Sequence, residues 1–106
     1  MSSSTDASTL SGAERRHLRG LAHGLRPVLQ VGKGGLTDAF VESVDEALAS
    51  HELIKIKFMD WKDEKRELSA EIAERTGAEP VGLVGHVAIF YRPAPDPEKR
   101  RIRLPR

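Results

Sequence analysis

Residues 28–37 have the sequence VLQVGKGGLT, in which a short apolar run, a glycine-rich turn and a helix start follow one another directly. The apolar run, Val28–Val31, is typical of a buried strand. The glycines of the turn let the backbone bend sharply and come close to a ligand, because they carry no Cβ. Thr37 belongs to the residue types that cap the beginning of a helix. A strand that leads directly into a helix favours an α/β fold.

The chain before this stretch is predicted to form a helix from Ser11 to about Leu25. Ser11 and Glu14 have the spacing of a capping box, in which each side chain bonds to the backbone of the other residue. Pro27 makes a continuation of the helix past Arg26 unfavourable. The helical period of the apolar residues predicts a buried stripe of Leu18, Leu21, Ala22 and Leu25.

The chain after this stretch alternates between helical and strand periods. Helices are predicted over residues 37–51 and 63–76, and strands over residues 53–59, 81–84 and 86–92. Ile54, Ile56 and Phe58 are expected on the buried side of the first of these strands, and Gly77 is expected to cap the last helix. The order α-β-α-β-α-β-β predicts an α/β fold with a mixed four-stranded sheet and packed helices, completed by a final antiparallel hairpin.

Length and composition indicate the domain organisation. A chain of 106 residues has room for one domain, which we expect over residues 11–93. Residues 1–10 are expected to be a disordered N-terminal tail, and residues 94–106 a basic, Pro-rich C-terminal tail. No stretch is apolar enough to span a membrane, and the start lacks the regions of a signal peptide. The chain has no cysteine, which excludes thiolate chemistry and suits the cytoplasm.

The formal net charge of +1 conceals three blocks of different sign. Residues 11–35 and residues 92–106 each carry a net charge of +4, whereas residues 36–91 carry −6. Such a molecule can hold a polyanion on one side while it stays soluble. The simpler interpretation is that these blocks are solvated surface, so charge alone leaves nucleic-acid binding open.

Gly32, Lys33, Gly34 and Gly35 form the sharpest candidate site. Their backbone can approach a phosphate, the following helix start offers N–H groups with a partial positive charge, and Lys33 adds a full charge. GxxG loops of this type clamp a nucleic-acid backbone in KH domains. The Walker A and dinucleotide-binding spacings are both absent. The structural alternative is a tight turn whose glycines only relieve strain.

Basic residues also gather on one side of the first predicted helix. At about 100° per residue, four of them fall within an arc of about 100°, and a fifth joins them if the helix extends far enough. These residues are Arg15, Arg16, Arg19, His23 and Arg26. The helix is expected to lie alongside the glycine loop, which predicts a nucleic-acid-binding site that consists of the loop and this helix.

Other candidate residues give weaker signals. Lys55 and Lys57 share one face of a predicted strand, where they either extend a basic surface or keep an exposed face soluble. Trp61 lies in a polar turn, where it either stacks on a base or covers an edge of the core. The histidines show no metal-ligand spacing, and no nucleophile or carboxylate pair is recognisable. We therefore expect no metal, no cofactor and no catalysis.

Four segments together resemble the bacterial YhbY proteins and the CRM domain of plant organelle splicing factors. They are RRHLRGLAH (15–23), PVLQVGKGGLT (27–37), HELIKIK (51–57) and YRP (91–93). The resemblance covers nearly everything after residue 10, up to the final IRLPR. Many members have a polar residue where this chain has Gly34, and residues 60–66 match the family least.

The resemblance implies a compact α/β fold similar to the C-terminal domain of translation initiation factor three. It also implies RNA binding by a GxxG loop that is similar to Gly32–Gly35 here. The expected partner is large-subunit ribosomal RNA or a pre-ribosomal particle, and the expected role is ribosome biogenesis in the cytoplasm. The alternative is an adaptor that docks basic ribosomal or assembly proteins through the acidic face of helix 37–51.

Overall fold

A computed structural model describes residues 10–105, within which the chain forms three α-helices and four strands. In chain order they are α1 (Gly12–His23), β2 (Leu29–Val31), α2 (Asp38–His51), β3 (Leu53–Phe58), α3 (Lys65–Thr76), β4 (Glu79–Val84) and β5 (Val87–Tyr91). The predicted order α-β-α-β-α-β-β is confirmed. The predicted N-terminal tail lies outside the described residues, except for residue 10.

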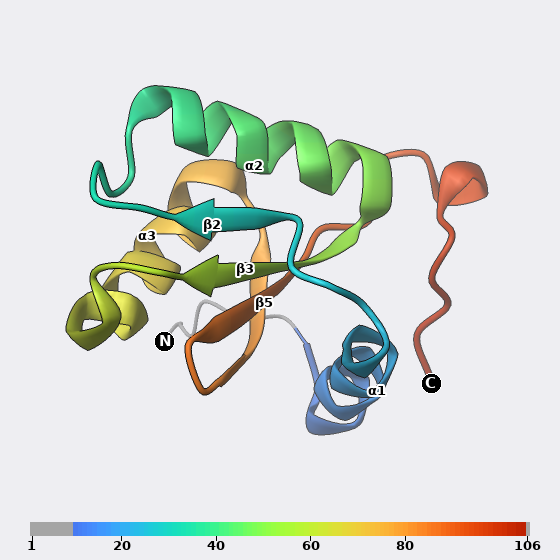
Figure 1. Ribbon diagram of the computed structural model, residues 1–106. Coiled ribbons are helices and arrows are strands. Elements are labelled where there is room, and N and C mark those ends of the chain that lie inside the picture. The colour runs from blue at the N-terminus through green and yellow to red at the C-terminus, as the bar shows by residue number, and fades with distance from the viewer. Residues whose placement is uncertain (1–9, 106) are drawn as a thin grey trace, which may run out of the picture.

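The strands form one mixed sheet in the order β2-β3-β5-β4 (Figure 1). β2 and β3 are parallel, with Val31 beside Phe58, because α2 carries the chain back to the end at which β2 begins. β5 is antiparallel to both β3 and β4. The predicted combination of a parallel pair with a final antiparallel hairpin is therefore confirmed.

Helices cover both faces of this sheet. α2 and α3 pack on one face, and α1 packs on the opposite face (Figure 1). Side chains alternate along β3, so Ile54, Ile56 and Phe58 enter the core beneath α2 and α3, as predicted. Leu53 points the other way and packs beneath α1. The sheet thus separates two apolar clusters, and the larger one contains both Phe58 and Phe90.

The first helix buries a narrower stripe than its sequence suggests. Leu18 and Ala22 are fully buried, but Leu21 and Leu25 are 43% and 41% exposed, so the prediction for these two leucines is wrong. α1 ends at His23, and it touches the sheet along a single line of side chains. Leu21 and Leu25 instead line an apolar hollow of about 510 Å³ between α1 and the chain's C-terminal segment.

Glu52 fastens that C-terminal segment to the domain. It follows α2 with a φ of 64°, and only 3% of it is exposed. Its carboxylate accepts hydrogen bonds from the backbone N–H groups of Ala94, Arg101 and Ile102 at 2.8, 2.9 and 3.1 Å. Burial raises the pKa of Glu52, but these three donors bring the pKa below its ordinary value. The segment after residue 93 is thus held in place, and the predicted domain end there stays a prediction.

Candidate nucleic-acid interface

The glycine loop after β2 is a tight turn. The Gly35 N–H donates to the Gly32 carbonyl at 3.0 Å, and Gly35 has a φ of 69°, which residues with a Cβ adopt only at a cost in energy. A Cβ added at Gly34 would make only an ordinary contact with Thr37, at 3.5 Å. The N–H groups of Lys33 and Gly34 form no hydrogen bond with any of residues 10–105. These two neighbouring donors are available to an anion.

Trp61 braces the loop from the segment that follows β3. Its Nε1–H donates to the Lys33 carbonyl at 3.1 Å, and Nε1 would lie 3.4 Å from a Cβ at Gly35. Trp61 has a φ of 59°, and a 3₁₀ turn at Lys62–Glu64 comes before α3. The predicted start of the third helix at residue 63 was therefore too early. Trp61 covers the loop rather than the core, and 47% of it is exposed.

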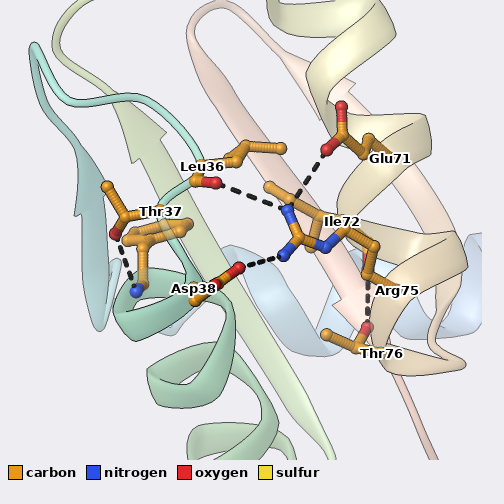
Figure 2. Close-up of polar contacts among 8 residues, drawn as sticks. Leu36, Thr37, Asp38, Glu71, Ile72, Arg75 and Thr76 are labelled. Carbon is orange, nitrogen blue, oxygen red and sulfur yellow. Dashed lines mark hydrogen bonds and ion pairs between the residues drawn. The ribbon is translucent and has the colours of Figure 1, made fainter.

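Arg75 of α3 holds the other end of the loop (Figure 2). Its guanidinium donates to the Leu36 carbonyl at 3.3 Å, and it also pairs with Asp38 at 2.9 Å and with Glu71 at 3.2 Å. Asp38 is the first residue of α2, so one side chain connects the end of the loop with two helices. The loop is consequently fixed at both of its ends.

The start of α2 offers less to an anion than the sequence suggests. Thr37 is the predicted N-cap, and its Oγ1 accepts the Phe40 N–H at 3.0 Å. Asp38 places a negative charge in the first turn, which already matches the positive end of the helix dipole. The free N–H groups of the loop, rather than the helix terminus, are therefore the stronger candidates for phosphate contacts.

Lysines from several elements gather beside the loop. Lys33 and Lys62 line one shallow hollow of about 570 Å³. The Lys65 Nζ donates to the Gly85 carbonyl at 2.6 Å and contacts the His86 Nδ1 at 3.2 Å, so Lys65 lies beside the start of β5. The pKa of His86 is lowered by desolvation and then by the positive charges of Lys65, Lys62 and Lys57. The sequence predicts Lys33 and Lys57 as interface residues but not Lys62 and Lys65. Only folding brings Lys62 and Lys65, just before and at the start of α3, to the loop end of the sheet. We call Gly32–Gly35 with Lys57, Lys62 and Lys65 the loop surface.

The first helix does not lie alongside the loop, which corrects the expectation from sequence. α1 lies on the face of the sheet opposite α2 and α3, near the beginning of β2 (Figure 1). The loop, in contrast, follows the end of β2. Arg15 and Arg19 face β4 instead. The Arg15 guanidinium donates to the Pro80 carbonyl, and the aliphatic part of Arg19 would lie 3.1 Å from a Cβ at Gly82. Burial of Leu18 against the sheet decides this orientation, since it turns the neighbouring Arg15 and Arg19 toward β4.

Lys55 joins this helix from the sheet. It shares a hollow of about 160 Å³ with Arg19 and His23. Its Nζ donates to the carbonyls of Ala22 and Leu25 at 3.0 Å each, so it caps the C-terminal end of α1. We call the basic residues around α1 the helix surface, which consists of Arg15, Arg16, Arg19, His23, Arg26 and Lys55. The contact of either surface with RNA stays a prediction.

Replacing Lys55 with Met is expected to lower the free energy of unfolding by about 1 kcal/mol, because two charge-assisted bonds to the end of α1 are lost. Urea denaturation measures the change. Lys57→Met is the matched control, since Lys57 is exposed on the same face of β3, and we expect a change within about 0.5 kcal/mol. Equal stabilities of the Lys55 and Lys57 variants would refute the capping role of Lys55.

Two further properties concern residues 10–105 as a whole. No group of three or more acidic or histidine side chains there is arranged to hold a metal ion. None of the helices in this part of the chain has the length and apolar character needed to cross a membrane.

Comparison with known families identifies the domain. Residues 10–92 match the family model described as the CRS1 / YhbY (CRM) domain. The chain belongs to the CRS1/YhbY (CRM) domain family. The match begins two residues before α1 and ends one residue after β5, so the resemblance predicted from sequence is confirmed.

Individual relatives of this CRM domain are similar over their whole length. A Haemophilus influenzae protein named "RNA-binding protein" is 39% identical over 99 residues, which cover 92% of this chain and 97% of the relative. The Bacillus subtilis "Probable RNA-binding protein YqeI" is 32% identical over 97 residues, which cover 91% of this chain and 99% of the relative. The solution structure of protein SAV1595 from Staphylococcus aureus matches with a TM-score of 0.77 and 34% identity, over 92% of this chain and 100% of that one. The predicted α/β fold is thereby confirmed.

Proposed function

We propose that this CRM domain binds RNA and that the loop surface contacts the RNA backbone. The observation that carries the proposal is the braced turn, in which the N–H groups of Lys33 and Gly34 have no partner among residues 10–105. Trp61 and Arg75 hold this turn at its two ends, so little ordering is needed when an anion binds. The names of the Haemophilus and Bacillus relatives support RNA as the ligand.

The helix surface would serve as a second contact with the same RNA. Phosphate contacts position a nucleic acid but carry little sequence information. Two separate basic surfaces, one near the beginning of β2 and one after its end, therefore favour recognition of RNA shape over recognition of a short sequence. Arg16 and Arg26 are exposed and suit this role, whereas Arg15 and Lys55 already donate to backbone carbonyls.

The finer assignment concerns the RNA itself. We propose structured ribosomal RNA in precursors of the large ribosomal subunit as the target, as the resemblance to YhbY proteins implies. The role would be one of binding rather than catalysis, in the cytoplasm, where a chain without cysteine is well suited. Crosslinking of the bound RNA, followed by mapping of the crosslinked positions, would identify the target.

Neutralising Lys33 is expected to weaken binding to a structured ribosomal RNA fragment by about 3- to 10-fold and to reduce the salt slope of log K by about one unit. Fluorescence anisotropy of labelled RNA at several salt concentrations measures both quantities. Lys99→Ala is a suitable control because Lys99 ends the short 3₁₀ turn Pro97–Lys99. The C-terminal segment that contains this turn lies away from the loop (Figure 1). If the double variant Lys33→Ala/Arg19→Ala leaves affinity and slope unchanged, the proposed surfaces are wrong.

The adaptor alternative would use the acidic face of α2. Two of its carboxylates are already paired in the fold, Asp38 with Arg75 and Asp45 with Arg92. This pairing leaves less negative charge for a basic partner and favours RNA. Salt-sensitive capture of a basic ribosomal protein from nuclease-treated extract, without binding to purified RNA, would reverse that preference.

A further inference from the structure

Trp61 is the one tryptophan of the chain, and it is held in an unusual way. Its backbone has a φ of 59° and a ψ of 35°, a left-handed conformation that is unfavourable for a residue with a Cβ. The indole Nε1–H is bonded to the Lys33 carbonyl, and the same edge of the ring contacts Gly35. Bracing the loop thus occupies one edge of the ring and leaves 47% of the residue exposed.

Trp61 and Lys33 both line one hollow beside the loop. This hollow has a volume of about 570 Å³, and it is also lined by Met59, Asp60, Lys62, Asp63 and Glu64. A nucleotide joins a flat base to a phosphate across one sugar. The free N–H groups of Lys33 and Gly34 and the indole of Trp61 are also neighbours, because the Trp61 Nε1–H donates to the Lys33 carbonyl. One nucleotide could therefore place its phosphate at the N–H groups and its base at the indole.

The charges in this hollow favour a base over a phosphate. Asp60, Asp63 and Glu64 line it together with two lysines, so its interior repels additional anions. Carboxylates accept hydrogen bonds from amino groups on base edges, as Asp and Glu do with cytosine N4. An exposed aromatic ring beside such acceptors suits an unpaired base that carries an amino group, namely cytosine, adenine or guanine, and disfavours uracil.

We propose that Trp61 stacks on an unpaired base that carries an amino group, cytosine, adenine or guanine, whose phosphate is held by the glycine loop. This inference rests on the proposed RNA-binding function and adds a base-recognition element to it. Stacking on aromatic side chains is the general means by which proteins hold single-stranded bases. The loop surface would then bind the backbone on one side of the ring and the base on the other.

The first test uses the intrinsic fluorescence of Trp61, which reports this position because the chain has one tryptophan. The full chain is titrated with a short unstructured RNA that contains cytosine and guanine, and with an abasic ribose-phosphate oligomer of equal length. Anisotropy of labelled oligomers establishes saturation in both cases. We expect strong quenching with the base-containing RNA and little with the abasic oligomer. Bound RNA that leaves the emission unchanged would overturn the stacking proposal.

The second test compares two substitutions. Trp61→Leu is expected to weaken binding of the base-containing RNA about 5- to 20-fold, and Trp61→Phe about 2- to 4-fold, because Phe retains a stacking ring. The abasic oligomer should respond much less to either change. Equal weakening of both oligomers by Trp61→Leu would mean that Trp61 only braces the loop. If no RNA binds the wild-type chain by anisotropy, the proposed function fails, and stacking fails with it.

Discussion

Replacing Glu52 with Gln is expected to lower the free energy of unfolding by about 2 kcal/mol at neutral pH, which is typical of a lost charge-assisted network in a buried place. One carboxylate oxygen accepts the N–H groups of Arg101 and Ile102, and the other accepts that of Ala94. A Gln side chain has only one acceptor oxygen, so its amide nitrogen must face a backbone donor. Urea denaturation measures the loss, and Glu46→Gln on the exposed side of α2 is the matched control.

The same substitution should remove part of the pH dependence of stability. The pKa of Glu52 is lower in the folded protein than its ordinary value, so the folded state favours the ionised form. Its contribution to stability is present above the ordinary pKa of about 4.3 and is lost as the pH falls through the lower folded pKa. The difference between wild type and Glu52→Gln should therefore shrink on acidification. An equal difference at pH 7 and in acid would contradict the role of the charge.

Replacing Gly34 with Asp is expected to weaken RNA binding by at least about 10-fold at low salt, because a negative charge enters the place proposed for a phosphate. The new carboxylate can also accept the free N–H groups of Lys33 and of residue 34 itself. Gly34→Ala is the matched control, and it should stay within about 3-fold, since a Cβ there makes only a 3.5 Å contact with Thr37. Anisotropy titrations with one structured RNA fragment measure both variants.

The comparison of the two Gly34 variants separates charge from shape. The loss caused by Asp should decrease as salt is added, because screening weakens the repulsion between exposed charges. Unfolding curves of both variants should match the wild type within about 0.5 kcal/mol, since Gly34 does not have a left-handed φ. If the Gly34→Asp and Gly34→Ala variants bind RNA equally well, the loop does not contact phosphates. The RNA interface must then be sought on the helix surface.

Sequence analysis predicted the elements well where the signal is local. The capping box of Ser11 and Glu14, the N-cap at Thr37 and the left-handed Gly77 all appear as expected. Each of these features depends on residues within one turn of each other, and so does the alternation along β3. The alternation could also predict one buried side of β3, but it could not show that the other side is partly covered by α1.

The composition of the candidate interface was harder to predict. The glycine turn and Lys33 are contiguous, so sequence could identify them. Trp61 and Arg75 come from later parts of the chain, and their contacts with the loop depend on how β3 and α3 pack. The placement of α1 was missed for the same reason, since the helical period gives an apolar face but not the face of the sheet on which it packs.

The sequence alone determined that this protein is an α/β domain with a glycine turn between a strand and a helix. It also sufficed to recognise the CRM family. Local periodicity, capping and turn residues suffice for that, because they act between near neighbours in the chain. Only the tertiary structure decided that the turn is braced by Trp61 and Arg75 and that Arg15 and Arg19 of α1 face β4. These contacts join residues far apart in the chain, and they follow from burial of two apolar clusters on opposite faces of one sheet.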